Sequence, residues 1–227
     1  MTGLNNMYET VELEIRDRLN QSKELINHIK ALEVSDQSPD LLKIQKGLLF
    51  VSLYSSIEYT ITNVVSRFLE LINTEQLKPL NFKKYLLCTV LDSKFNALLG
   101  SSKKTVWNKK KDFFDALFSS EAVSIDDSVF PTDGINISQQ QIEDVWEIFH
   151  LAGNAFPDEI NTWILREIKE HRNAIAHGRE KASSIGGRYT AATLNQRVSD
   201  VESLCFHIVS GFEAFTTSKG YLVSSAA

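Results

Sequence analysis

The sequence has few of the residues that interrupt helices or cross-link a chain. Its 227 residues include 10 glycines, 4 prolines and 2 cysteines. Because glycine and proline mark turns, their scarcity favours long helices over a turn-rich β fold. Cys88 and Cys205 lie far apart among apolar neighbours, so we interpret both as reduced core residues rather than as a disulfide or part of a metal site.

The sequence also predicts neither a signal peptide nor an unbroken membrane-spanning segment. Its first residues, MTGLNNMYETVELEI, have neither a basic start nor a continuous apolar run. The most apolar stretch, residues 47–65, is interrupted by serine, threonine, asparagine and glutamate, which favours a buried helix over a membrane span. We therefore expect a cytoplasmic protein that makes no contact with a membrane.

Composition and charge exclude some further classes of protein. A hydrophobic content of 43% and a charged content of 23% are ordinary for a soluble globular protein, and a chain of this length can bury a core of its own. The net charge of −5 argues against a nucleic-acid coat protein, although it allows a local basic site.

Apolar residues recur in steps of three and four, which is the period of an α-helix. The pattern predicts helices over residues 8–33, 40–73, 80–100, 138–149, 158–177 and 193–217, with a short helix inside 101–120. We predict an all-α fold, a bundle of four to five main helices in one domain spanning residues 1–227. Its core would comprise about 8–73 and 138–217, and about 78–137 would form a short helical insertion.

Several residues mark where these helices begin and end. The predicted starts are Ser38 before Pro39, and the capping boxes Ser138 with Gln141 and Thr193 with Gln196. Gly100 and Gly178 predict helix ends. Between the helices we expect loops over 121–137, where Asp126, Asp127, Pro131, Asp133 and Gly134 act as breakers, and over 179–190, and a frayed tail after Ser218.

The clearest chemical signal is the stretch REIKEHRNAIAHG, Arg166 to Gly178. Asn173 and His177 are four residues apart and share a helix face, and Arg172 can reach round the small Ala176 toward the same helix end. Arginine binds a phosphodiester with forked donors and stabilises charge that builds on it. Histidine can take a proton from a hydroxyl or give one to a leaving oxygen near neutral pH.

This pair of side chains suits RNA as a substrate. RNA supplies its own nucleophile, the 2′-OH beside each phosphate, so cleavage by internal transfer needs neither a metal nor another cofactor. The other histidines do not form a ligand set, so we predict no metal-binding residues. One Arg–His pair approaches a phosphate from one side only, whereas two copies related by a two-fold axis would surround it. We therefore expect a homodimer.

Three features have plainer interpretations that the residues alone leave open. The Arg172–His177 spacing also fits a helix end with a dipole-stabilising histidine and a surface arginine. Glu58, alone in an apolar helix, is either the partner of an arginine on another helix or a side chain that reaches the surface. Basic residues around Trp107 could follow an RNA backbone or form a solvated helix face; they are Lys103, Lys104, Lys109, Lys110 and Lys111.

The segment RNAIAHG, Arg172 to Gly178, resembles the Arg-polar-x3-His signature of the HEPN superfamily of helical ribonucleases. Upstream, LYSSIE, residues 53–58, resembles the aliphatic-Tyr-x3-Glu helix of the RiboL-PSP and MAE-like HEPN branches. Residues 135–153 resemble the segment before their Arg–His helix. The resemblance covers roughly residues 40–215.

The resemblance implies that Arg172 and His177 are catalytic, that Asn173 supports them, and that Glu58 is a partner of Arg172. It implies a homodimeric, metal-independent endoribonuclease of the toxin or antiviral-defence type that leaves 2′,3′-cyclic phosphate ends. The alternative is a non-catalytic HEPN module that binds a nucleotide, RNA or protein. HEPN toxins paired with nucleotidyltransferase antitoxins often carry a tyrosine two residues after the histidine. Here Arg179 stands at that position, so we expect a different antitoxin or regulatory protein partner.

Overall fold

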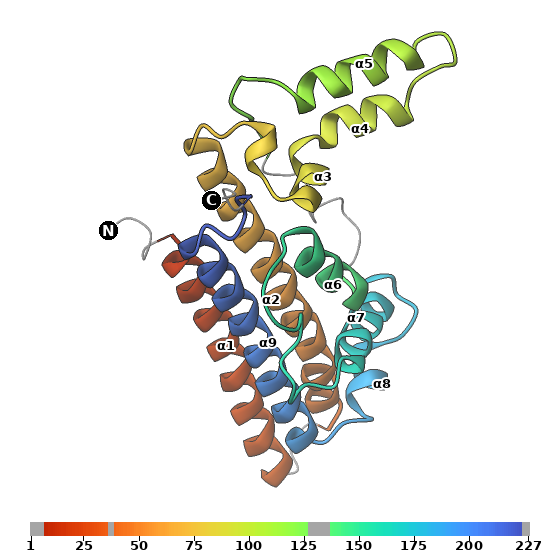
Figure 1. The fold of residues 1–227 in the computed structure, drawn as a ribbon. Helices are drawn as coiled ribbons and strands as arrows, with labels where there is room; N and C mark the ends of the chain where they lie inside the picture. The colour runs from red at the N-terminus through yellow and green to blue at the C-terminus, as the bar shows by residue number, and fades with distance from the viewer. Residues whose placement is uncertain (1–6, 36–38, 127–136, 224–227) are drawn as a thin grey trace.

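A computed structural model describes residues 7–35, 39–126 and 137–223, and this part of the chain is all-α, as predicted (Figure 1). The helices are α1 (Glu9–Ser35), α2 (Pro39–Thr74), α3 (Leu87–Val90), α4 (Asp92–Leu99), α5 (Val106–Leu117), α6 (Gln139–Ile148), α7 (Trp163–Ala176), α8 (Ala182–Gly186) and α9 (Ala191–Thr217), with 3-10 turns η1 (Pro79–Asn81) and η2 (Lys84–Leu86). The predicted cap Ser38, the breakers from Asp127 to Gly134, and residues 135–136 lie outside the described residues.

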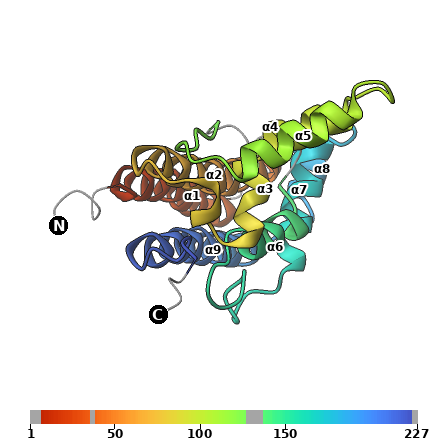
Figure 2. The same ribbon diagram turned by 45° about the horizontal axis from the view of Figure 1, so that its top comes forward.

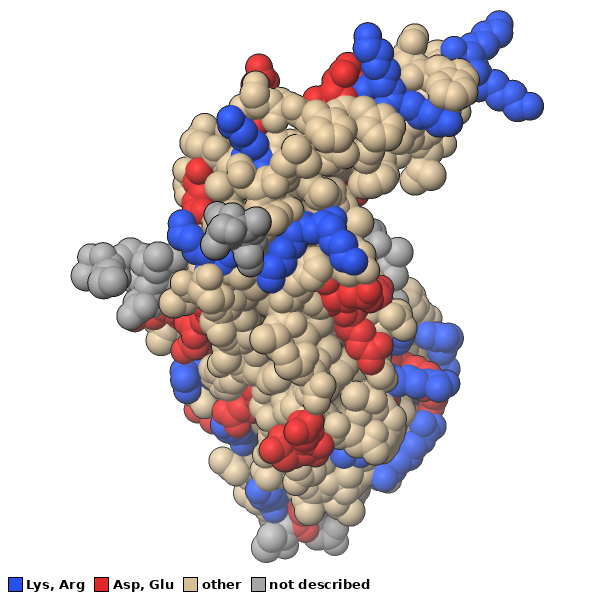
Figure 3. Space-filling model, viewed as in Figure 1, with Lys and Arg blue, Asp and Glu red and all other residues tan. Residues whose placement is uncertain are grey.

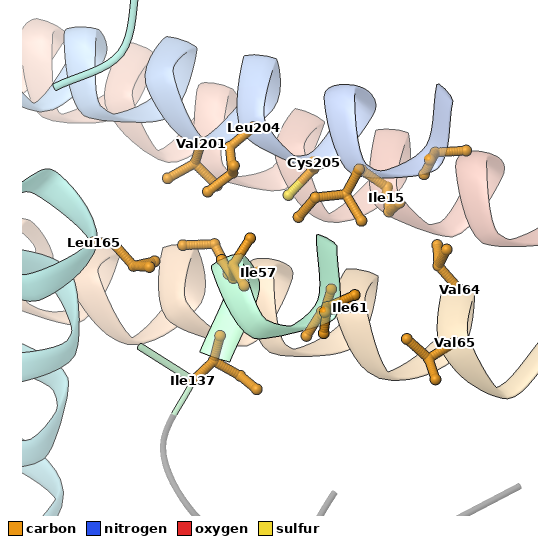
Figure 4. Packing of buried hydrophobic residues seen from close by; sticks show 14 of the residues in the cluster. Ile15, Ile57, Ile61, Val64, Val65, Ile137, Leu165, Val201, Leu204 and Cys205 are labelled. Atoms are coloured by element: carbon orange, nitrogen blue, oxygen red, sulfur yellow. The ribbon is translucent and has the colours of Figure 1, made fainter. Parts of the chain in front are cut away.

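The three long helices α1, α2 and α9 pack on one another and enclose the core (Figure 1). In Figure 4, Ile57 and Ile61 of α2 face Val201 and Cys205 of α9, and Ile15 of α1 lies beside them. All five side chains are buried, so the predicted apolar stripes are confirmed. Removal of such branched side chains from water is the main stabilising contribution in a fold of this kind.

The helix α2 is as long and as apolar as a membrane-spanning helix. By length and composition alone α2 could cross a membrane, but more than half of its most apolar window is buried inside the protein. The core helix of a soluble protein passes the same test, and the contacts of α2 with α1, α7, α8 and α9 are those of a core helix. Cys205 is buried, as predicted, whereas Cys88 is exposed and not a core residue.

A close crossing joins α8 to α2, in a stretch that was predicted to be a polar loop. Gly47 of α2 and Gly186 of α8 meet at the crossing, where a Cβ on Gly47 would collide with the carbonyl oxygen of Ala182. Ile185 is buried against the core beside them. The prediction of a loop over 179–190 was therefore wrong for residues 182–186, because two glycines let a five-residue helix approach the α2 backbone.

The predicted helix over residues 80–100 is broken into η1, η2, α3 and α4. Phe82 adopts an extended conformation and buries its ring, and the backbone beside it pairs with the C-terminal segment. Lys83 N donates to Tyr221 O at 2.9 Å, and Val223 N donates to Asn81 O at 2.9 Å. The prediction of a frayed tail was therefore wrong for residues 219–223, since this pairing and the buried Tyr221 hold the segment in place.

Other predicted boundaries were partly confirmed. Ser138 and Gln141 form the predicted capping box of α6, and α4 ends at Gly100. However, α7 begins at Trp163 rather than 158, because residues 157–162 form turns. The N-cap of α9 is Thr190 rather than Thr193, since the Thr190 hydroxyl accepts from Thr193 N at 3.1 Å.

The helices α4 and α5 form a hairpin that projects from the bundle (Figure 1). In Figure 1 and in the turned view of Figure 2, the hairpin extends toward the same side of the molecule as α7 and α8. The segment after the hairpin returns to the end of α2, where Asn73 makes two hydrogen bonds of 2.8 Å with the backbone of Ile125.

Candidate active site

The candidate site forms where α7 packs against the middle of α2. The guanidinium carbon of Arg172 lies 3.7 Å from the centroid of the Tyr54 ring, and Nη2 lies 4.0 Å from Oε1 of Glu58. The arginine side chain is only 20% exposed. An arginine placed over an aromatic face is attracted by the ring quadrupole, so the ring fixes the plane of the guanidinium.

Tyr54 is itself fixed in place from both ends. Its ring is buried in the core, and its hydroxyl accepts a 2.7 Å hydrogen bond from the backbone N–H of Ile137. Burial raises the pKa of the Tyr54 hydroxyl above its ordinary value, an effect that the nearby Arg172 charge opposes. Tyr54 therefore stays neutral at physiological pH and presents a rigid ring to Arg172.

The end of α7 places His177 at the surface. His177 is the C-cap, and Gly178 follows in the left-handed conformation with φ of 66°. Gly178 N donates to Ile175 O at 3.1 Å and Arg179 N to Ala174 O at 2.8 Å, which is the Schellman pattern of a helix end. The predicted helix end at Gly178 is confirmed, and the exposed imidazole is accessible to a substrate.

Arg172 and His177, the two predicted catalytic residues, lie at the same end of α7. Among the interactions of the described residues, none joins their side chains. Five positions along a helix correspond to about 7.5 Å of rise. Two buried polar atoms at this helix end, Oδ1 of Asn173 and Nε of Arg172, have no hydrogen-bond partner in the described part of the chain. Unpaired polar atoms of this kind favour occupation by a polar ligand or water.

An open pocket adjoins this end of α7. It has a volume of about 440 Å3 and is lined by Glu170, Asn173, Ala174, Arg179 and Glu180. The pocket therefore offers room for part of a substrate beside the predicted supporting residue Asn173.

Glu58 differs from the sequence-based picture in its burial. Its side chain is 48% exposed, so it reaches the surface rather than being enclosed in the apolar helix. It nevertheless lies at the outer limit of ion-pair distance from Arg172, which is the arginine expected from the sequence. The placement fits both interpretations in part, and the supporting role of Glu58 stays a prediction.

A second polar network behind the candidate site was missed by the sequence analysis. His171 Nε2 lies 2.6 Å from the Tyr189 hydroxyl, which donates to Oε1 of Glu167 at 2.9 Å. Nε of Arg197 donates to the other oxygen of Glu167 at 2.6 Å. The spacing of Glu167 and His171, four residues apart on one helix face, was the signal available in the sequence.

This network is largely buried and joins three elements. Burial lowers the pKa of His171 and raises the pKa of Tyr189 to about 12. A neutral His171 whose Nε2 donates to Tyr189 is consistent with Tyr189 donating onward to Glu167. The network ties α7 to α9 and to the chain after α8, so it holds the helix that carries Arg172 and His177.

The five lysines predicted to contact RNA lie elsewhere, on and before α5 in the projecting hairpin (Figure 3). Four of them are exposed and Lys109 is partly buried. Among the described residues, no group of three His, Cys, Asp or Glu side chains is placed to hold a metal ion.

Comparison with protein families agrees with this geometry. The model of the RiboL-PSP-HEPN family matches residues 16–212, which includes α2, α7 and the α4–α5 hairpin. The chain belongs to the RiboL-PSP-HEPN family. HEPN membership supports a nuclease or an RNA-binding module in general. No curated protein and no solved structure gives a significant match.

Within this HEPN chain the family motif and the structure coincide at one place. The match spans both Tyr54-x3-Glu58 on α2 and Arg172-x4-His177 on α7, and the fold packs Arg172 against Tyr54 and Glu58. The HEPN family includes ribonucleases and also non-catalytic members.

Proposed function

We propose that the protein is a metal-independent endoribonuclease of the toxin or defence type. The single observation that supports this most is the placement of Arg172: Tyr54 fixes its guanidinium at the end of a helix that also presents an exposed His177. A fixed cation and an exposed imidazole on one helix end are the phosphate-binding group and the base that cleavage by the 2′-OH needs.

In the proposed mechanism, His177 takes the proton from the 2′-OH as its oxygen attacks the adjacent phosphorus. Arg172 binds the non-bridging phosphate oxygens and stabilises the charge that builds on them. The bond to the 5′-oxygen breaks, and this oxygen receives a proton from an acid on the opposite side. The products are a 2′,3′-cyclic phosphate and a 5′-OH end.

The need for an acid opposite the base is the argument for a homodimer. One His177 cannot stand on both sides of the phosphorus, whereas two copies about a two-fold axis would place two histidines and two arginines around it. The small and exposed Ala176 would let the partner backbone approach this helix end. A second protein that restrains the activity, as an antitoxin or regulator, is part of the same proposal.

The test is cleavage of RNA in the presence of a chelator. Wild type should cut, and Arg172→Ala and His177→Ala should each lose about 100-fold or more in kcat/KM. Arg166→Ala on the exposed face of α7 and His28→Ala on α1 are matched controls that should keep full activity. Equal cleavage by wild type and both site variants, or no cleavage by any of them, would remove the proposal.

The composite site has its own test. A mixture of Arg172→Ala and His177→Ala subunits should cleave faster than either variant alone but more slowly than wild type. The heterodimer holds one intact arginine and one intact histidine, and it lacks the second histidine that would act as the acid. Sedimentation should show a dimer at the concentration of the assay. A monomer that cleaves at the full rate would exclude a site that is shared across two subunits.

One observation favours a second candidate, a HEPN module that binds a nucleotide, RNA or protein without cleaving. Arg172 is only 20% exposed and is held by Tyr54 and Glu58, so it could serve the packing of α7 on α2. In that case the site variants would lose thermal stability, and wild type would bind RNA without producing cyclic phosphate ends.

A further inference from the structure

The projecting hairpin carries a row of exposed aromatic rings that nothing in the described chain covers. Trp107, Phe114 and Phe118 are 73%, 56% and 66% exposed. Side chains of this size and polarity are normally buried, and a row of three on one short helix is unusual for a free surface.

The geometry of α5 puts these rings in one line. At 3.6 residues per turn, positions 107, 114 and 118 fall within about 40° of one another around the helix, spaced by about 10 Å and about 6 Å along it. The opposite side of α5 faces the body of the protein, since Asp112 and Asp115 line a groove of about 450 Å3 against residues 121–124. The aromatic row therefore points away from the body.

Lysines border the row on both sides. Lys110 and Lys111 lie about 60° to one side and about 40° to the other side of Trp107. The ammonium of Lys110 lies 4.5 Å from the centroid of the Trp107 ring. Lys103 and Lys104 extend the positive charge beyond the start of α5, and Figure 3 shows lysine side chains on either side of uncharged surface there.

The charge of the hairpin differs in sign from that of the whole protein. Residues 92–119 contain six lysines and three aspartates, which gives +3, whereas the chain carries −5. Positive charge confined to one projecting element favours a polyanion as the partner of that element.

We propose that this surface, formed by Trp107, Phe114, Phe118, Lys110 and Lys111, binds single-stranded RNA by base stacking and phosphate contacts. Every base has a π-face that can stack on an aromatic ring, and lysines beside the rings can follow the backbone. The lysine ammonium beside the Trp107 ring favours bases joined by phosphates over the apolar contacts of a protein partner.

The hairpin extends toward the side of the molecule that carries the candidate active site. In both Figure 1 and Figure 2 this is the side of the bundle that carries α7. Resting on the proposed function, we infer that the hairpin holds an unpaired strand of the substrate while Arg172 and His177 act on one phosphate. Specificity would then be for unpaired RNA of any sequence rather than for a duplex.

The test measures binding of the full-length protein to a 2′-O-methyl oligonucleotide of about 20 residues by fluorescence anisotropy. This probe lacks the nucleophile, so cleavage does not interfere. Trp107→Ala with Phe114→Ala should weaken binding about tenfold or more, because each stacked base contributes substantially to affinity. Trp107→Phe keeps a ring and should bind nearly as wild type. Leu13→Ala, an exposed apolar residue on α1, is the control.

A second arm tests the lysines. Lys110→Gln with Lys111→Gln should reduce the slope of log affinity against log salt by about 1.4, since each phosphate contact on a single strand contributes about 0.7. The charge-matched pair Lys30→Gln with Lys43→Gln should leave the slope unchanged. All four lysines lie on the surface, so these variants should keep the wild-type melting temperature.

The outcomes separate this inference from the proposed function. Wild-type affinity in the Trp107 and Phe114 variant, or no RNA binding by any protein, would overturn the inference. So would Trp107-dependent binding to vesicles with 30% phosphatidylserine but not to RNA. Cleavage that persists with unchanged binding in the hairpin variants would overturn the inference alone, whereas hairpin-dependent binding without cleavage would overturn the proposed function alone.

Discussion

The guanidinium of Arg172 rests on the ring of Tyr54, with 3.7 Å between Cζ and the ring centroid. Glu58, one turn further along α2, lies 4.0 Å from the same guanidinium. The residue that would bind the phosphate is thus positioned by a neutral aromatic face on one side and a half-exposed carboxylate on the other. A neutral platform orients the arginine without cancelling its charge.

Replacement of Tyr54 should therefore affect catalysis through Arg172. Tyr54→Leu removes the ring, and we expect a loss of about tenfold in kcat/KM. A cation–π contact contributes about 0.5 kcal/mol at an exposed site and about 2 kcal/mol at a buried one. Tyr54→Phe keeps the ring and loses only the hydrogen bond from Ile137, so it should retain most of the activity. Steady-state RNA cleavage measures both. Equal activity of the Leu and Phe variants, with equal melting temperatures, would argue against the platform.

Two glutamates on neighbouring helices should differ sharply in their contribution to stability. Glu167 and Arg197 form an ion pair whose side chains are 9% and 13% exposed. Arg197 also lies 3.7 Å from Asp200, so Glu167→Gln does not leave its charge unpaired and should lower the free energy of unfolding by about 1.5–3 kcal/mol. Glu58→Gln removes a half-exposed and longer contact and should cost about 1 kcal/mol or less. Urea denaturation measures the loss of unfolding free energy in each variant. A loss in Glu58→Gln as large as that in Glu167→Gln would show that burial does not decide the contribution of these ion pairs.

His171 should make the fold sensitive to acid. Burial lowers its pKa in the folded state below the ordinary value near 6.5, so below that pH the unfolded chain binds the proton more readily. Stability should thus be full above about pH 6.5 and fall as the pH drops further. His171→Gln keeps a donor for the Tyr189 hydroxyl without a titrating ring. The variant should therefore lose less melting temperature than wild type between pH 7.5 and pH 5.5; an equal loss would assign the acid sensitivity to other groups.

Much of this architecture could be predicted from the sequence because it depends on local patterns. The apolar period located α1 and α2 to within about two residues, and Ser138 with Gln141 marked the start of α6. The left-handed glycine after His177 is another local signal. Each of these features involves residues within one or two helical turns of each other.

The features that escaped prediction depend on residues that are far apart in the chain. The ring of Tyr189 meets His171 across 18 positions, and Tyr221 pairs with the backbone near Phe82 across more than a hundred. The apolar run over residues 80–100 has the local pattern of one helix. It is divided because a distant segment, residues 219–223, pairs with its backbone, and no local pattern shows this. Glu58 shows the same limit, since its exposure depends on which helices pack beside it.

The crossing of α2 and α8 gives the sharpest test of such a long-range feature. A Cβ on Gly47 would overlap the carbonyl oxygen of Ala182, and a Cβ on Gly186 would overlap that of Lys43. Backbone atoms cannot rotate away as a side chain can, so Gly47→Ala should displace α8 and lower stability by about 2 kcal/mol or more. Because α8 leads into Tyr189, the same variant should also release His171 and reduce RNA cleavage. Gly100→Ala is the matched control, since its Cβ would lie 3.5 Å from the nearest atom and α4 ends there without a left-handed turn. That variant should melt at or slightly above the wild-type temperature, as fewer conformations are open to its unfolded chain.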